Sequence, residues 1–188
     1  KRGQEAIDSY EEVLSRFGDA KEVSLREWVA MALVNKGNRL GEMKRGQEAI
    51  DSYEEVLSRF GDAKEVSLRE PVAMALNGIG FGLLLESKRA WSDGDLRTWR
   101  LVAAEARFSR ASDQDPNNYL VLGNLAYVHF LSGRREFVSE MLQRALKLGG
   151  EELYKATIKD TETDTVPEDA DFRVLVEKVW ADMQTQKS

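Results

Sequence analysis

The stretch KRGQEAIDSYEEVLSRFGDAKEVSLRE at residues 1–27 returns letter for letter at residues 44–70. When residues 1–33 are compared with residues 44–76, 32 of 33 positions are identical, and the one difference is Trp28 against Pro71. The copies are offset by 43 residues, and fixed periods of about 20 to 50 residues are typical of helical repeat proteins. We therefore expect an architecture of successive helical units.

Each 43-residue unit has the pattern of a helical hairpin. Residues 4–17 predict one helix, because their apolar side chains recur at spacings of three and four: Ala6, Ile7, Tyr10, Val13, Leu14 and Phe17. Gly18 is expected to end it. A second helix is expected from Ser24 to about Glu42, because Ser24 followed by Glu27 has the spacing of a capping box. In the second copy Pro71 falls in the first turn, where proline is tolerated.

The remaining helices are expected from Ser67 to about Trp91 and at about residues 96–112, 119–131 and 136–148, followed by a short one from Glu151 and an amphipathic last one. The last helix carries one apolar stripe: Phe172, Leu175, Val176, Val179, Trp180 and Met183. The predicted domains are a helical repeat array at 1–150 and capping helices at 151–188. Within the array we expect a half repeat at 1–23 and hairpins at about 24–61, 67–116 and 119–150.

The composition limits the classes of function. The chain has 188 residues, 42% hydrophobic and 32% charged, and a net charge of -6. Basic and acidic residues are interleaved, so no positive stripe for phosphate backbones is predicted and no nucleic-acid partner is expected. Apolar runs are too short for a membrane span, and a cytoplasmic location is expected. Because the sequence starts without Met inside a unit, we expect a fragment of a longer protein, with further 43-residue units before Lys1.

No catalytic residue, metal site or cofactor is expected. His129 is the only histidine and there is no cysteine, so a Ser/His/Asp or Cys/His set has nowhere to form apart from His129 itself. His129 is expected to be hydrogen-bonded inside a hairpin. The run from Gly78 to Gly82 lies in a helical pattern, and we interpret it as close helix packing rather than a phosphate loop. The acidic residues between Asp160 and Asp171 lack the glycine and glutamate of a calcium loop, so a solvated linker is expected.

Small and large residues recur in these hairpins at set spacings: Leu33, Gly37, Leu40, Ala49, Tyr53, Val56 and Gly61, and later Ala104, Phe108, Ala111 and Pro116. In this pattern the chain resembles the tetratricopeptide repeat family, in its bacterial-type variant with a long period. The resemblance implies an all-α fold, a right-handed superhelix of about three and a half hairpins. Gly80 and Ala104 are 24 residues apart where Gly37 and Ala49 are 12 apart, which predicts a lengthened hairpin with Trp91 and Trp99 near its tip.

The resemblance also implies a concave groove, lined by the first helix of each hairpin, that binds a peptide or helix of a protein partner. Its groove positions in this sequence are Asn35, Asn38, Arg39, Asn77, Phe81, Asn124, Tyr127 and Phe130. Alternatively, Phe81, Tyr127 and Phe130 pack against the last helix. The expected function is a non-catalytic interaction scaffold. Two rivals are a homo-dimer formed through the first half unit, with Ile7, Tyr10 and Leu14 exposed, and the regulatory arm of a larger enzyme.

Overall fold

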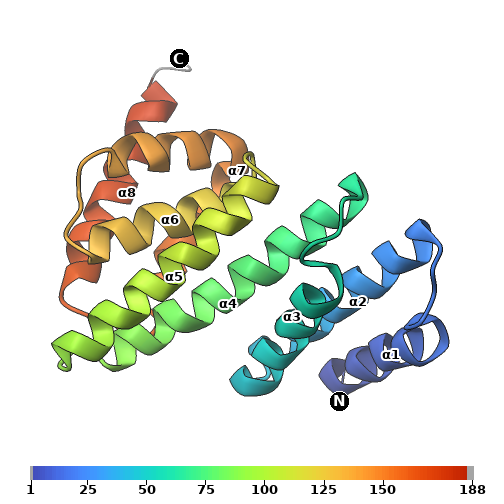
Figure 1. Ribbon diagram of the computed structural model, residues 1–188. Coiled ribbons are helices and arrows are strands. Elements are labelled where there is room, and N and C mark those ends of the chain that lie inside the picture. The colour runs from blue at the N-terminus through green and yellow to red at the C-terminus, as the bar shows by residue number, and fades with distance from the viewer. Residues whose placement is uncertain (1, 186–188) are drawn as a thin grey trace. The chain divides into compact units, whose positions relative to one another are not determined.

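The computed structural model describes residues 2–185, and over this range it is all-α, as predicted, with no β-strand. In Figure 1 successive helices are joined by short connections. The helices are α1 (Arg2–Phe17), α2 (Val23–Glu42), α3 (Gly46–Phe60), α4 (Arg69–Arg89), α5 (Gly94–Gln114), α6 (Tyr119–Leu131), α7 (Val138–Asp160) and α8 (Glu168–Thr185), with a short 3-10 turn, η1 (Val66–Leu68).

Two compact units make up the chain, Lys1–Gly82 and Leu83–Ser188, and the boundary lies within α4. The division after residue 150, expected from the repeat pattern of the sequence, stays a prediction.

The first unit is built around α2, which packs against both α1 and α3. Five apolar side chains of α2 are at most 1% exposed: Val29, Ala30, Leu33, Val34 and Leu40. Tyr53 of α3 lies between two glycines, because a Cβ added at Gly37 or at Gly78 would come within 2.5 Å of its ring. Gly78, the first residue of the run Gly78–Gly82, therefore serves close helix packing, as predicted.

The predicted capping box at Ser24 is wrong. Helix α2 already begins at Val23, its N-cap residue is Glu22, and no side chain caps it. Ser24 thus lies inside the first turn, whereas a capping side chain must come from the residue before the helix. The equivalent Ser67 lies in η1, and its Oγ atom is buried without a hydrogen-bond partner.

Helices α5 to α8 follow one another in the second unit, and each packs against the next. Asp93 and Asn118 are the N-cap residues of α5 and α6, and their side chains accept hydrogen bonds from backbone N–H groups at 3.0 and 3.2 Å. Helix α7 is kinked at Gly150, with φ 57° and ψ -147°, because glycine adopts a positive φ without steric cost. This is the position where the sequence predicted a break.

The extra residues of the long hairpin are helical. Helix α5 has 21 residues where α3 has 15. Trp91 lies in the turn before α5, with the Arg97 guanidinium 4.8 Å from its ring centre, and Trp99 is 64% exposed. Among residues 2–185, one segment, Val66–Arg89, is long and apolar enough by length and composition alone to cross a membrane, with a mean hydropathy of 1.2. Half of this apolar stretch is buried inside the protein. Core helices of soluble proteins can be equally long and apolar.

Candidate partner-binding faces

The structure divides the eight predicted groove residues into two groups. Five lie in the first unit and keep part of their surface exposed: Asn35, Asn38 and Arg39 on α2, and Asn77 and Phe81 on α4. Three lie on α6 in the second unit, where Asn124 is half-buried and Tyr127 and Phe130 are 2% and 4% exposed. We call the first group the α2/α4 face and the second group the α6 face.

On the α2/α4 face, one predicted residue is part of the packing between helices. The Tyr53 hydroxyl of α3 donates a hydrogen bond of 2.7 Å to Oδ1 of Asn38. Burial raises the pKa of Tyr53 to about 12, and the nearby Glu42 carboxylate contributes to the rise. Arg39 forms an ion pair with Glu42. The side-chain oxygen of Asn38 therefore already accepts a hydrogen bond, although the residue is exposed on the α2/α4 face.

The α6 face is covered by helix α8. The ring of Phe172 stacks on Tyr127 with centroids 4.5 Å apart and lies 5.1 Å from the ring of Phe130. Tyr127 and Phe130 therefore do not line an open groove. The alternative, that they pack against the last helix, holds for these two residues, because α8 brings its apolar stripe onto α6 and α7.

A buried polar cluster fastens the start of α8 to this face. The Lys88 ammonium donates to the Tyr127 hydroxyl at 2.8 Å and to the backbone carbonyl of Asp160 at 3.0 Å, and it lies 3.1 Å from Oδ2 of Asp169. The Tyr127 hydroxyl donates to Asp169, and so does the backbone N–H of Val166, at 2.8 Å. The side chains of Lys88 and Asp169 are 0% and 2% exposed. An ammonium has three N–H donors, and each has an acceptor here, so the buried charge is satisfied.

Burial shapes the ionisation of this cluster. It raises the pKa of Tyr127 well above its ordinary value, and the hydrogen bond to Asp169 and that residue's charge contribute in the same direction. Tyr127 is therefore a neutral donor. Burial also raises the pKa of the Asp160 side chain, to about 6, although the positive charges of Lys88 and Lys159 oppose the rise.

The prediction that the acidic stretch is a solvated linker is wrong for Asp169. Its partner Lys88 is 81 positions earlier in the chain, so the residues around Asp169 do not identify that partner. One signal was available: Asp169 precedes Phe172 and Val176 at helical spacing and so falls on the apolar stripe of the last helix. A carboxylate in that position predicts a buried cation or hydrogen-bond donor opposite it.

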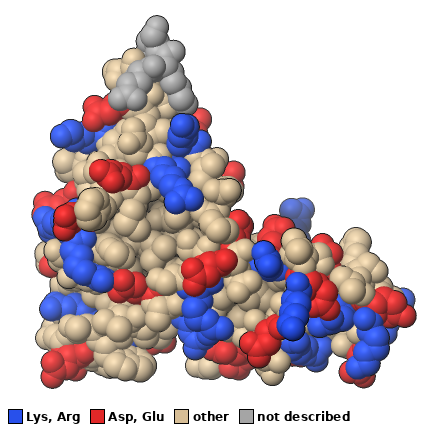
Figure 2. Space-filling view, turned by 45° about the horizontal axis from the view of Figure 1, so that its top comes forward, with Lys and Arg blue, Asp and Glu red and all other residues tan. Residues whose placement is uncertain are grey.

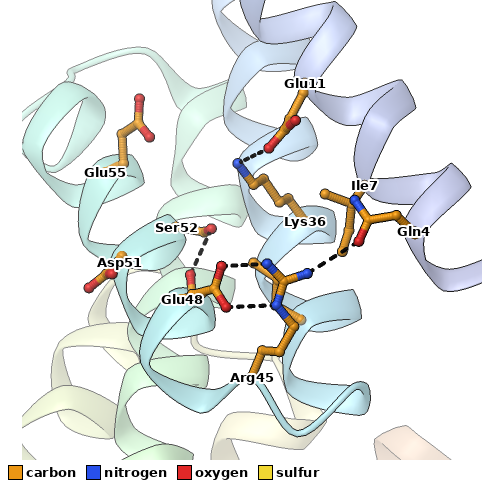
Figure 3. A pocket seen from close by; sticks show the side chains of 10 residues that line it. Gln4, Ile7, Glu11, Lys36, Arg45, Glu48, Asp51, Ser52 and Glu55 are labelled. Carbon is orange, nitrogen blue, oxygen red and sulfur yellow. Dashed lines mark hydrogen bonds and ion pairs between the residues drawn. The ribbon is translucent and has the colours of Figure 1, made fainter.

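The first unit contains a cavity of about 250 Å³ between α1, α2 and α3 (Figure 3). Ile7 and Leu40 contribute its apolar lining, and charged side chains surround them. The two basic side chains of the lining are already paired: Lys36 lies 2.9 Å from Glu11, and the Arg45 guanidinium binds Glu48 at 2.7 Å and Gln4 at 3.3 Å. The cavity is thus a seam between the two copies of the repeated helix.

Ile7 is 2% exposed at this seam. The prediction that Ile7 is exposed in the first half unit is wrong, because α1 packs its apolar stripe onto α2. Tyr10 and Leu14 remain half-buried.

His129 belongs to the packing between α5 and α6. Its Nε2 atom lies 3.3 Å from the Glu105 carboxylate, which also forms a two-pronged pair with Arg134 at 2.9 and 2.6 Å. Burial lowers the pKa of His129, and Arg134 lowers it further, while Glu105 opposes both effects. The side chain is 27% exposed, so His129 is half-buried, and the structure places it beside a partner from the neighbouring helix.

Within residues 2–185 no three His, Cys, Asp or Glu side chains gather closely enough to hold a metal ion. Figure 2 shows lysine and arginine side chains interleaved with aspartate and glutamate over the visible face. Comparison with known proteins finds no family model and no curated protein that matches the chain.

Proposed function

We propose that the chain is a non-catalytic protein-interaction module, built as a right-handed superhelix of helical hairpins, that binds a peptide or helix of a partner on the α2/α4 face. The observation that carries this proposal is the seating of α8 on the α6 face. There Tyr127 and Phe130, two residues at the groove positions of the resemblance, already hold an amphipathic helix through the ring of Phe172.

The predicted groove residues Asn35, Asn77 and Phe81 of the first unit are half-buried and keep part of their surface exposed. The amide group of Asn35 can both donate to and accept from a peptide backbone. Phe81 is half-buried and offers an apolar surface for an anchoring side chain. A helix laid into an apolar groove, with a few polar contacts fixing its orientation, is a recurring mode of peptide recognition.

The charges on the α2/α4 face limit the kind of partner that fits it. Arg39 lies on the α2/α4 face and pairs with Glu42 of its own helix, so this pair presents both signs. We propose a partner helix whose affinity comes from an apolar or aromatic anchor and from hydrogen bonds, with a weak dependence on ionic strength.

A peptide selection on the whole chain tests this proposal. Peptides recovered from a random library would be measured against a variant with Asn35→Ala, Asn77→Ala and Phe81→Ala, with helical content checked by circular dichroism. The matched control is a variant with Asp62→Ala and Lys64→Ala, two exposed residues of the connection after α3. We expect the first variant to lose at least about tenfold in affinity, since tenfold corresponds to about 1.4 kcal/mol and losing an anchor costs about 2 kcal/mol or more, and the control to lose none. Peptides that bind both variants equally would place the binding surface elsewhere.

A further inference from the structure

The repeated helix occurs twice in the first unit with the same sequence and two different environments. Residues 3–17 of α1 and residues 46–60 of α3 read GQEAIDSYEEVLSRF in both copies. In α3 the side chains of Ser52, Tyr53, Val56 and Phe60 are buried. Their copies in α1 are an exposed Ser9, a half-buried Tyr10, a half-buried Val13 and a Phe17 that is 40% exposed. The same surface is therefore seen once covered and once open.

The covered copy shows what this surface binds. Helix α2 packs on α3 with Gly37 against the Tyr53 ring, where a Cβ would come within 2.5 Å of Cε1. The next residue, Asn38, accepts the hydrogen bond of the Tyr53 hydroxyl at 2.7 Å. The Arg26 guanidinium lies over the Phe60 ring at 5.6 Å. The cover thus consists of a small residue followed by an amide, with a guanidinium three turns earlier on the same helix.

The contact between α3 and α1 also includes polar groups whose copies in α1 are exposed. Arg45, the N-cap residue of α3, donates a hydrogen bond of 3.3 Å to Gln4 of α1. Arg59 of α3 donates one of 3.4 Å to the backbone carbonyl of Gly18. Arg45 and Arg59 have exposed copies in α1, Arg2 and Arg16. Helix α1 therefore carries both the apolar and the polar part of an interface that is filled one unit later.

We propose that the open face of α1, defined by Ser9, Tyr10, Val13 and Phe17, is a docking surface for a helical hairpin with the sequence of residues 1–43. The partner helix is one with the chemistry of α2: a small residue under the Tyr10 ring, an asparagine oxygen for its hydroxyl, and a guanidinium over Phe17. This interface is separate from the α2/α4 face and does not depend on the proposed function.

A lengthened chain tests the proposal. An extra copy of residues 1–43 is placed before Lys1, and its junction then reproduces the natural order of Met43 and Lys44. Tyr10→Phe is measured in the original and in the lengthened chain. In the lengthened chain we expect the unfolding equilibrium constant to change about fivefold, the typical effect of a lost hydrogen bond. In the original chain we expect almost no change. An equally small effect in both chains would overturn the proposal.

Hydrogen exchange of α1 supplies the second readout. The amides of Arg2–Phe17 should exchange at least about tenfold more slowly in the lengthened chain, because the helix becomes interior. The matched control carries Gly37→Glu in the added copy only, which removes the space for the Tyr10 ring and should abolish the protection. Equal protection by the control copy would contradict the proposal. So would a concentration-dependent dimer of the original chain in which α1 packs against α1 of the second copy, because the occupant would then lack the chemistry of α2.

Discussion

The ammonium of Lys88, near the end of α4, lies 3.1 Å from the carboxylate of Asp169, in the first turn of α8, and both side chains are closed off from solvent. The pair fixes where α8 starts on the α6 face. Phe172 follows one turn later and stacks on Tyr127, the residue whose hydroxyl lies between the two charges. Buried ion pairs add little net stability compared with apolar replacements, but they penalise every arrangement that separates the partners.

The first prediction concerns this pair. Lys88→Met alone or Asp169→Leu alone should each lower the free energy of unfolding of the chain by about 3 to 5 kcal/mol, because each leaves an uncompensated buried charge. The double variant should recover much of that loss, since neither charge remains. Denaturant unfolding followed by circular dichroism measures the three values. A double variant that loses the sum of the two single losses would contradict the account.

A second prediction concerns pH. Burial raises the pKa of Asp160 from 3.8 to about 6, so between about pH 4 and pH 6 the folded state binds this proton more readily than the unfolded state. The contribution of Asp160 to stability therefore falls as pH rises through that window. Asp160→Asn should leave stability unchanged near pH 4 and raise it by about 2 to 3 kcal/mol at pH 7.5. Unfolding curves at the two pH values check this, and an identical gain at both would rule out the titration.

The two copies of the repeated helix give a third prediction with a built-in control. Phe60 is 5% exposed and Phe17, its copy, is 40% exposed. Phe60→Ala should cost about 3 kcal/mol or more, as expected for a buried phenylalanine, and Phe17→Ala less than half as much. The measurement is the free energy of unfolding of each variant. Equal losses would mean that the two helices are covered to the same degree.

Two glycines of α2 give the fourth prediction. A Cβ at Gly37 would meet the Tyr53 ring at 2.5 Å, whereas one at Gly41 would meet nothing within 4 Å. Gly37→Ala should therefore destabilise the chain by about 1 to 3 kcal/mol through overpacking. Gly41→Ala, in the same helix, should stabilise it by up to about 1 kcal/mol, because alanine favours helix over glycine. Thermal unfolding compares the two, and a harmless Gly37→Ala would show that the ring can move aside.

Local patterns in the sequence predicted much of the helical structure. Apolar spacing predicted α6 at its observed bounds, and the paired glycines predicted the kink of α7 at Gly150. These features depend on residues within a few turns of one another. The predicted start of α2 was wrong by one residue. Because α2 begins at Val23, Ser24 is a residue of its first turn and does not cap it.

Contacts between distant segments could not be predicted in the same way. Whether Tyr127 faces an open groove or a helix depends on where α8 lies, and the position of α8 depends on Lys88 and Asp169 meeting across 81 residues of sequence. The repeated sequence does not show which copy is covered, because residues 3–17 of α1 and 46–60 of α3 have the same sequence and differ only in the helices that pack on them. For the same reason Ile7, predicted to be exposed, is buried.

The most direct test of the proposed function is amide hydrogen exchange of the whole chain with and without a peptide obtained in the selection described above. If the chain binds a helix or peptide on the α2/α4 face, exchange should slow at residues 35–39 of α2 and 77–81 of α4 when the peptide is present, and should stay unchanged in α1. Protection that appears only in α1, or only in α5 to α8, would contradict the account.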